Sequence, residues 1–271
     1  MILITGATGN IGTELVKRLV TKRTPIRIMI RDEKKIAHLG PEVGRVIGDR
    51  HEPSVVQRAL QDVEKVFVLS GTFDIDHEAD RLLIKKAKNA DIRQIVLISS
   101  STVHLAEKNG VGVFHQEKEM LVEESGIPWT FLRPGAFMSN ALQWVDTIKS
   151  QRKVFNPNGS GKVAPISPYD ITAVAALALI SSGHQGKAND LTSSQLLSTH
   201  DQVHILSKVI DTPIKCIDIP TEVAAERLKA SGIPEILIQG FSRSHDPDPQ
   251  RRIYLLRKRS RKADRATGAN L

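Results

Sequence analysis

The turn TGATGNIG at residues 5–12 limits the fold more than any other stretch of the chain. An apolar strand, ILI, runs into this turn, and a helix with apolar residues at helical spacing follows it. In such a unit Gly6 allows the tight turn, Gly9 lets backbone amides approach a pyrophosphate, and Gly12 lets the helix pack on the strand. An ordinary tight turn is the alternative, but the placement between strand and helix favours a dinucleotide site at the helix N-terminus.

Strands and helices alternate through the first half of the chain. The pattern predicts strands at 25–32, 44–49, 63–71, 92–101 and 128–135, and helices at 53–60, 77–90 and 114–125. Near-continuous apolar strands separated by helices indicate a parallel sheet that is covered on both faces. The predicted fold class is therefore α/β, a Rossmann-type doubly wound parallel sheet with a smaller C-terminal substrate lobe.

The second half is less regular. The pattern predicts a surface turn at 156–162, strands at 187–193 and 213–220, and helices at 167–181, 198–210 and 221–232. Thr199 or Asp201 is expected to cap the second of these helices. We expect an NAD(P)-binding Rossmann domain over 1–155, a smaller substrate lobe over 156–239 that is interleaved with it, and an irregular basic tail over 240–271.

The positive charge of the chain is concentrated in that tail. The whole chain carries a formal charge of +8, but residues 240–271 hold nine basic and three acidic residues, so the remainder is close to neutral. This distribution argues against nucleic acid as a partner.

Other features of the composition narrow the class of protein. Cys216 is the one cysteine, which excludes an intrachain disulfide, and we expect it to be a buried apolar residue. The chain shows no signal peptide and no apolar run of about 20 residues, so we expect a cytoplasmic protein without a membrane span. We assign no metal site, and we expect a monomer or homodimer.

The end of the second strand indicates which cofactor is bound. An acidic residue about 20 positions after the glycine turn usually binds the ribose hydroxyls, whereas arginine favours a 2′-phosphate. Here Arg31 ends the strand, with Asp32 next and Lys35 one turn on, which favours NADPH over NADH. A solvated strand end is the alternative for Arg31. Asp49, at the end of the third strand, is a candidate partner of the adenine edge, or else a turn cap.

The motifs IRDEKK at 30–35, VLISSS at 96–101 and above all HQEKEMLVEESGIPWTFLRPGAFMSN at 115–140 resemble a known family. It is the NmrA-like group of atypical short-chain dehydrogenases/reductases, which includes triphenylmethane-reductase-like enzymes and quinone oxidoreductases. The resemblance implies an NADPH-binding fold, with the turn of Pro134, Gly135 and Phe137 along the nicotinamide. It carries the other cofactor contacts onto Gly6, Thr8, Gly9, Asn10, Ile11, Arg31, Asp49, Leu69, Ser70, Gly71 and Ser99.

The tyrosine and lysine pair that most short-chain dehydrogenases use for proton transfer is missing from the expected helix. Tyr169 has no lysine four residues later, and Tyr254 with Lys258 matches the spacing only in the irregular tail. Alignment with the family places His115 at the lysine position, where an imidazole with a pKa near 6.5 is a candidate proton relay. A surface histidine on an amphipathic helix is the alternative.

Two functions follow from these residues. One is an NADPH-dependent reductase of quinone-like or other conjugated acceptors, with a pocket lined by Phe137, Met138, Asn140 and Trp144. The other is a non-catalytic redox sensor that binds dinucleotide and acts through a protein partner. The missing tyrosine favours the sensor, whereas Ser99, Ser100 and His115 near the nicotinamide favour the enzyme. A core role for Phe137, Met138 and Trp144 is the alternative to a substrate pocket.

The tail departs from the family pattern. Dropping one nucleotide from the codon of Gly240 allows a helical start, and dropping one from the codon of Lys262 allows an ending, Thr-Gly and then Arg-Thr-Phe, that resembles the ending of relatives. We therefore hypothesise a shifted reading frame from about Gln239 onward, which resequencing of independent clones tests. A basic arm for nucleic acid or an anionic membrane is the alternative. On either reading we expect the tail to pack poorly.

Overall fold

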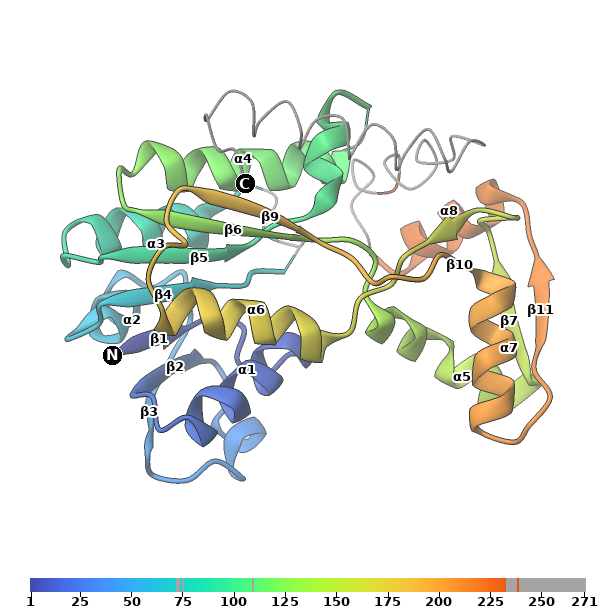
Figure 1. Cartoon of the computed structure of the whole chain (residues 1–271), viewed down its shortest axis with the longest axis horizontal. Helices are drawn as coiled ribbons and strands as arrows, with labels where there is room; N and C mark the ends of the chain where they lie inside the picture. The colour runs from blue at the N-terminus through green and yellow to red at the C-terminus, as the bar shows by residue number, and fades with distance from the viewer. Residues whose placement is uncertain (72–73, 75, 109, 233–237, 239–271) are drawn as a thin grey trace.

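The computed structural model describes residues 1–71, 74, 76–108, 110–232 and 238. Its centre is a sheet of seven parallel strands in the order β3-β2-β1-β4-β5-β6-β9 (Figure 1). This arrangement confirms the predicted Rossmann-type α/β fold. The strands are β1 (Ile2–Ile4), β2 (Ile26–Ile30), β3 (Val43–Ile47), β4 (Lys65–Val68), β5 (Gln94–Ile98), β6 (Trp129–Pro134) and β9 (Lys187–Leu191).

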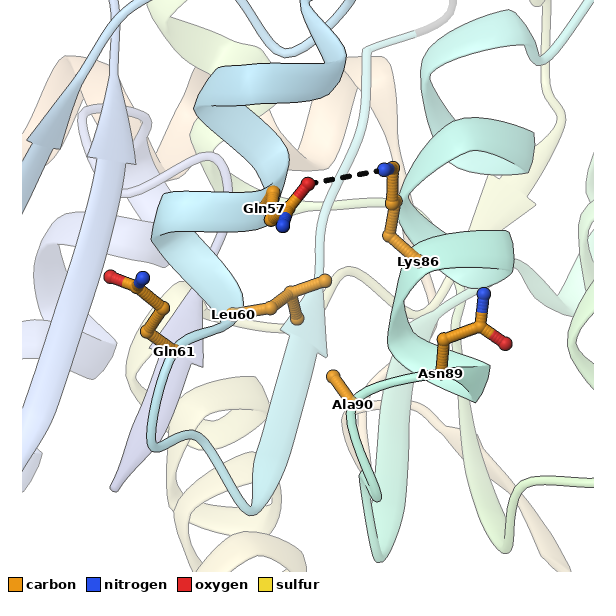
Figure 2. Close-up of a pocket in the computed structure, with 6 residues that line it drawn as sticks. All are labelled: Gln57, Leu60, Gln61, Lys86, Asn89 and Ala90. Atoms are coloured by element: carbon orange, nitrogen blue, oxygen red, sulfur yellow. Dashed lines mark hydrogen bonds between the residues drawn. The ribbon is translucent and has the colours of Figure 1, made fainter.

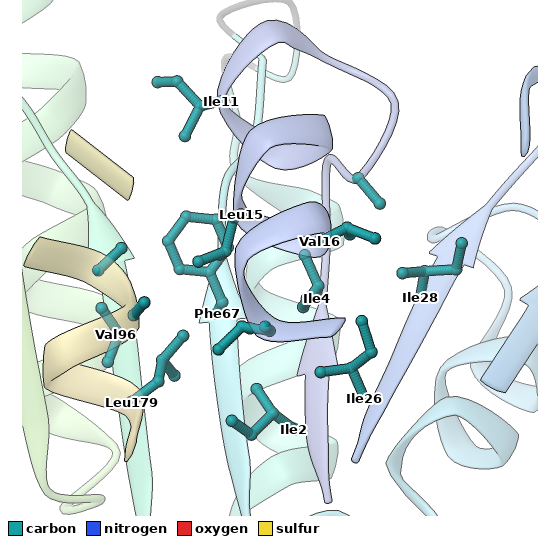
Figure 3. Packing of buried hydrophobic residues seen from close by; sticks show 14 of the residues in the cluster. Ile2, Ile4, Ile11, Leu15, Val16, Ile26, Ile28, Phe67, Val96 and Leu179 are labelled. Carbon is teal, nitrogen blue, oxygen red and sulfur yellow. The ribbon is translucent and has the colours of Figure 1, made fainter. Parts of the chain in front are cut away.

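Helices cover both faces of this sheet. Buried residues of α1 and α6 pack on one face, and those of α2, α3 and α4 pack on the other. Figure 3 shows the first core, in which Leu15 of α1 and Leu179 of α6 lie near Phe67 of β4. The helices are α1 (Asn10–Thr21), α2 (Pro53–Leu60), α3 (Glu78–Lys88), α4 (Gly110–Glu124) and α6 (Pro168–Ile180), with 3-10 helices η1 (Glu33–Ile36), η2 (Ser101–Lys108) and η3 (Met138–Trp144).

A smaller lobe lies beyond the carboxyl end of β6 (Figure 1). Two short sheets, β10 with β8 and β11 with β7, form its strands. The elements are α5 (Val145–Gln151), β7 (Lys153–Asn156), β8 (Lys162–Val163), β10 (Leu197–Ser198), α7 (Thr199–Val209), β11 (Lys215–Asp218) and α8 (Thr221–Ala230). The chain returns from this lobe to the main sheet to form α6 and β9, and this return interleaves the two parts.

Two expectations for the small lobe need correction. The cap of α7 is Ser198, whose Oγ accepts from the backbone N–H of Asp201, while the Asp201 carboxylate accepts from the N–H of Ser198. The sequence analysis missed this reciprocal capping box, in which Asp201 is the third helical residue and not the cap. Cys216 is partly exposed rather than buried, since it lies on a two-stranded sheet at the surface.

Among the described residues, none of the helices has the length and apolar character that a membrane span requires. The expectations for the tail at 240–271, including the shifted reading frame, concern residues outside the described part of the chain.

Candidate cofactor and active site

The predicted cofactor residues follow the carboxyl ends of neighbouring parallel strands. β1 lies between β2 and β4, so the chain changes direction across the sheet at the β1 and β4 pair. Ligands of open α/β sheets bind in the crevice outside such a switch point. Thr5 holds the two strand ends together, because its Oγ1 donates toward Leu69 O and accepts from the Leu69 N–H at 2.9 Å.

Packing within the protein explains two of the three glycines of the turn, Gly6 and Gly12, but not Gly9. A Cβ on Gly12 would lie 2.0 Å from Gly6 O, and one on Gly6, whose φ is +65°, would lie 2.7 Å from Leu69 O. A Cβ on Gly9 would meet only Gly6 O, at an ordinary 3.6 Å. The fold therefore requires Gly6 and Gly12, whereas the bare backbone at Gly9 fits a pyrophosphate that comes close to it.

The N-terminus of α1 is open to a phosphate. Gly9 is the N-cap residue, and it has no side chain that could cap the first turn of this helix. Thr8 and Asn10 are exposed, and Ile11 is buried in the core below. The first N–H groups of a helix have no partner within it and carry a partial positive charge, so the open end of α1 fits an anionic group.

Charged side chains follow the ends of β2 and β3. Arg31 and Lys35 are exposed, and Asp32 caps η1 by accepting from the Lys34 N–H at 3.0 Å. Asp49 accepts from the backbone N–H and from Nδ1 of His51, at 2.9 and 2.7 Å. The bonds from His51 lower the pKa of Asp49, and Arg31 contributes to the shift. Asp49 thus acts as a turn cap in this structure, and its contact with adenine stays a prediction.

A buried lysine supports the end of β4. Lys118 of α4 is 1% exposed, and its Nζ donates to Ser70 Oγ at 2.5 Å. Ser70 Oγ in turn donates to Asp80 Oδ2 at 2.7 Å, and Lys118 Nζ lies 3.6 Å from the same oxygen. This chain of contacts fixes the segment of Leu69, Ser70 and Gly71 against α3 and α4.

Two further charges complete this buried group. Arg50 contacts Asp80 at 3.0 Å and Asp74 at 2.9 Å, and Asp74 also caps the N-terminus of α3. Burial lowers the pKa of Lys118, while the neighbouring Asp80 opposes this shift. Two cations and two carboxylates therefore compensate one another below the predicted cofactor site.

His115 is held neutral. It is half-buried, and its Nδ1 is buried without a hydrogen-bond partner among the residues that the structure describes. Burial, with the nearby charge of Lys118 second, lowers its pKa to about 3. The pKa is therefore lower than the expected value near 6.5, and the ring is not a fully exposed surface histidine, whereas its role as a proton relay stays a prediction. As a neutral ring it can still donate or accept a hydrogen bond.

We expect a pH-dependent effect on stability when His115 is replaced by glutamine. The folded protein keeps the ring neutral, whereas the unfolded chain takes up a proton near pH 6.5. Protonation thus favours unfolding as the pH falls through 6.5, and the wild type should lose about 2 kcal/mol relative to His115→Gln between pH 7 and pH 5. Urea unfolding at both pH values measures this difference.

The exposed His38 provides the matched control for this experiment. His38→Gln should keep the pH dependence of the wild type. Identical pH profiles for His115→Gln and the wild type would show that the ring titrates normally in the folded protein.

The ends of β5 and β6 complete the site. Ser99 is 2% exposed, and within the described part of the chain its Oγ has no hydrogen-bond partner. The turn from Pro134 to Phe137 is fixed by neighbouring backbone, since the Gly135 N–H donates to Leu191 O at 2.9 Å. An unpartnered hydroxyl and a rigid turn at this edge fit the predicted nicotinamide position.

The predicted substrate residues differ in their surroundings. Phe137 packs partly against the core and Trp144 is half-buried, whereas Asn140 is exposed and Met138 is 45% exposed. The core alternative is therefore wrong for Met138. A pocket at these residues stays a prediction.

Two cavities among the described residues lie at the opposite edge of the sheet. One, of about 350 Å³, lies between the carboxyl ends of α2 and α3, where Lys86 Nζ donates to Gln57 Oε1 at 3.3 Å (Figure 2). The other, of about 430 Å³, lies at the amino ends of β1 and β4. Neither is lined by a predicted site residue, so neither is the candidate site.

Sequence reasoning missed a fully buried lysine of this region. Phe114, Lys118 and Val122 follow one another at intervals of four on the buried face of α4. A lysine on an apolar helical stripe is the signal that would have identified Lys118, because lysine is almost never fully buried unless it is paired. Its partner Asp80 carries the same signal, because it shares the buried stripe of α3 with Leu83 and Ala87.

The switch point, the open glycine turn and the uncapped N-terminus of α1 together define a dinucleotide-binding protein of the Rossmann class. Comparison with known sequences agrees, because residues 6–181 match the NAD(P)H-binding family. The chain belongs to this family, and the expected NmrA-like group and the expected class, an NAD(P)H-dependent reductase, are confirmed.

Three similar proteins illustrate the relationship. An NAD(P)H azoreductase of Xenophilus azovorans is 34% identical over 243 residues, which cover 89% of this chain and 85% of the relative. A (4-alkanoyl-5-oxo-2,5-dihydrofuran-3-yl)methyl phosphate reductase of Streptomyces griseus is 33% identical over 237 residues, covering 87% and 83%. The solved structure of an NADPH-dependent quinone oxidoreductase of Escherichia coli, in complex with NADPH, is 25% identical with a TM-score of 0.77, covering 89% and 87%.

Proposed function

We propose that this protein transfers hydride from NADPH to a quinone-like, azo or other conjugated acceptor, without a tyrosine and lysine pair. The observation that carries the proposal is the half-buried His115 beside Lys118, with a pKa lowered by burial and by the charge of Lys118, in a family whose relatives include azo and quinone reductases. An electron-poor conjugated acceptor can take hydride without a strong acid in the site, because water can supply the proton afterwards.

The residues of the site have separate tasks in this proposal. The N-terminus of α1 binds the pyrophosphate, and the turn of Pro134, Gly135 and Phe137 orients the nicotinamide ring. The reduced nicotinamide supplies the hydride when it is bound. His115, kept neutral by burial and by Lys118, offers a hydrogen bond to the ribose or to the acceptor. Met138 and Asn140, both exposed, form the acceptor side of the site.

Arg31 supports the preference for NADPH over NADH. The carboxylate of Asp32 is directed to the Lys34 N–H, which leaves Arg31 and Lys35 as exposed cations at the end of β2. A guanidinium can bind a phosphate with two parallel hydrogen bonds. These cations therefore favour a 2′-phosphate over a free ribose hydroxyl.

We expect Arg31→Ala to weaken NADPH binding by about tenfold or more and to leave NADH binding nearly unchanged, since a hydrogen bond to a charged group contributes about 1.5–3 kcal/mol. Arg58→Ala, at an exposed position in the last turn of α2, is the matched control. Cofactor fluorescence measures affinity, and nicotinamide absorbance with a panel of quinones and azo dyes measures turnover. Equal losses for both cofactors would contradict the assignment of Arg31.

The same assay separates the reductase from the sensor. Acceptor-dependent consumption of NADPH supports the reductase. Tight binding without reduction of any acceptor would favour the non-catalytic sensor, for which the missing tyrosine also argues. Capture of a protein partner that depends on NADPH would then be the next measurement.

A further inference from the structure

Three side chains with metal-ligating atoms meet on the surface of the small lobe, away from the glycine turn. Cys216 and Asp218 lie on β11, and His200 lies in the first turn of α7. One ligating atom of each lies within 4.8 Å of those of the other two, and His200 Nε2 is 3.6 Å from Asp218 Oδ1. Residues two apart on a strand share a face, so β11 presents both of its ligands to α7.

Neighbouring residues hold two of these side chains in place. Asp218 Oδ1 accepts from Asn156 Nδ2 at 2.6 Å, and Asn156, on the adjacent strand β7, is fully buried. The capping box of Ser198 and Asp201 fixes the first turn of α7, which carries His200. Metal ligands are typically oriented by hydrogen-bonded neighbours of this kind.

The donor set selects the type of metal. An imidazole, a thiolate and a carboxylate are the three ligand types that Zn²⁺ binds, and three protein ligands leave a fourth tetrahedral position for water. Two ligands bound at about 2.0–2.1 Å in a tetrahedron are about 3.4 Å apart, which is close to the spacing of His200 and Asp218. Mg²⁺ and Ca²⁺ prefer sites made of oxygen ligands alone.

We propose that His200, Cys216 and Asp218 form a Zn²⁺ site that joins α7 to β11. Because β11 pairs with β7, the ion connects α7 to the two-stranded sheet of β7 and β11. Figure 1 shows α7 and β11 at the end of the molecule that is remote from the main sheet. The site therefore clamps the small lobe and takes no part in hydride transfer.

Titration with Co²⁺ tests this proposal directly. Cys216 is the only cysteine of the chain, so any thiolate-to-cobalt charge-transfer band reports on this residue alone. We expect the band, with tetrahedral visible absorption, to saturate at one Co²⁺ per chain and to disappear when Zn²⁺ is added. Zn²⁺ should also raise the melting temperature.

Variants assign the ligands. Cys216→Ser should abolish the band, and His200→Asn or Asp218→Asn should weaken Co²⁺ binding by about tenfold or more. The exposed His204, one turn further along α7, provides the matched control, and His204→Asn should bind as the wild type does. No band in the wild type, a band at one Co²⁺ per two chains, or unchanged affinity in His200→Asn and Asp218→Asn would each overturn the proposal. Because the wild-type titration is informative by itself, the test does not depend on the folding of a variant.

Discussion

Replacing Lys118 with methionine is expected to lower the free energy of unfolding by about 3 kcal/mol. The substitution keeps an unbranched apolar side chain of similar volume but removes the charge that faces Asp80 at 3.6 Å and the bond to Ser70 at 2.5 Å. Asp80 is 3% exposed, so it would retain Arg50 as its one remaining cation while it stays buried. An intact buried ion pair adds little to the free energy of unfolding. Removing one of its members lowers this free energy strongly, because the charge that stays buried loses its compensation.

Urea unfolding at pH 7 measures this effect, and Lys85→Met provides the control. Lys85 is an exposed lysine on α3, and its replacement should change stability by less than about 0.5 kcal/mol. Equal effects of the two substitutions would show that the buried group contributes no more than a surface charge.

The same variant tests the electrostatic coupling to His115. The charge of Lys118 is the second largest cause of the lowered pKa of His115. Lys118→Met should therefore raise the pKa of the imidazole toward 6.5, which NMR titration of the ring detects. A loss of stability with no change in this pKa would mean that Lys118 supports the fold without affecting the candidate catalytic ring.

The glycines of the dinucleotide turn should respond in opposite ways to alanine. Gly12→Ala would place a Cβ 2.0 Å from Gly6 O, a backbone atom that cannot move without opening the turn, and we expect a loss of about 3 kcal/mol or more in stability. Gly9→Ala would add a Cβ at an ordinary distance with φ at −85°, so stability should change by less than about 1 kcal/mol.

Cofactor binding provides the other half of this contrast. Gly9→Ala should weaken NADPH binding strongly in a protein that remains folded, because the new methyl group occupies the space that the pyrophosphate needs. Thermal unfolding and cofactor fluorescence on both variants measure the two effects. NADPH affinity unchanged in Gly9→Ala would exclude the close approach of phosphate to this glycine.

The main sheet could be predicted from the sequence because its strands are buried on both faces. Runs such as IRIMI and QIVLI are apolar at almost every position, and turn residues and helical patterns separate them clearly. The elements α5 and β7 were missed, because segments of seven and four residues are too short for a helical or strand periodicity to be recognised. The place of β9 in the main sheet also escaped prediction, since its sequence KANDL is not apolar.

The candidate site was predictable only in part. The glycine turn and the strand ends could be identified, because their residue types are required by backbone geometry and sheet topology. The group formed by Lys118, Asp80 and Arg50 depends on side chains that are 30 and 38 residues apart in sequence, and no local pattern brings them together. The lowered pKa of His115 results first from burial and second from the charge of Lys118, and both depend on tertiary packing that sequence reasoning could not predict.

The late position of α6 in the chain has a consequence for biosynthesis. Leu15 and Val16 of α1 share a core with Ile171, Ala175 and Leu179 of α6, so one face of the main sheet is completed by residues that follow the first part of the small lobe. Until residue 180 has left the ribosome, the nascent nucleotide-binding half exposes this apolar face to solvent. Chain termination before α6 should therefore yield an aggregation-prone fragment rather than an autonomous domain, and contacts of such high sequence separation favour slow folding that completes only after translation.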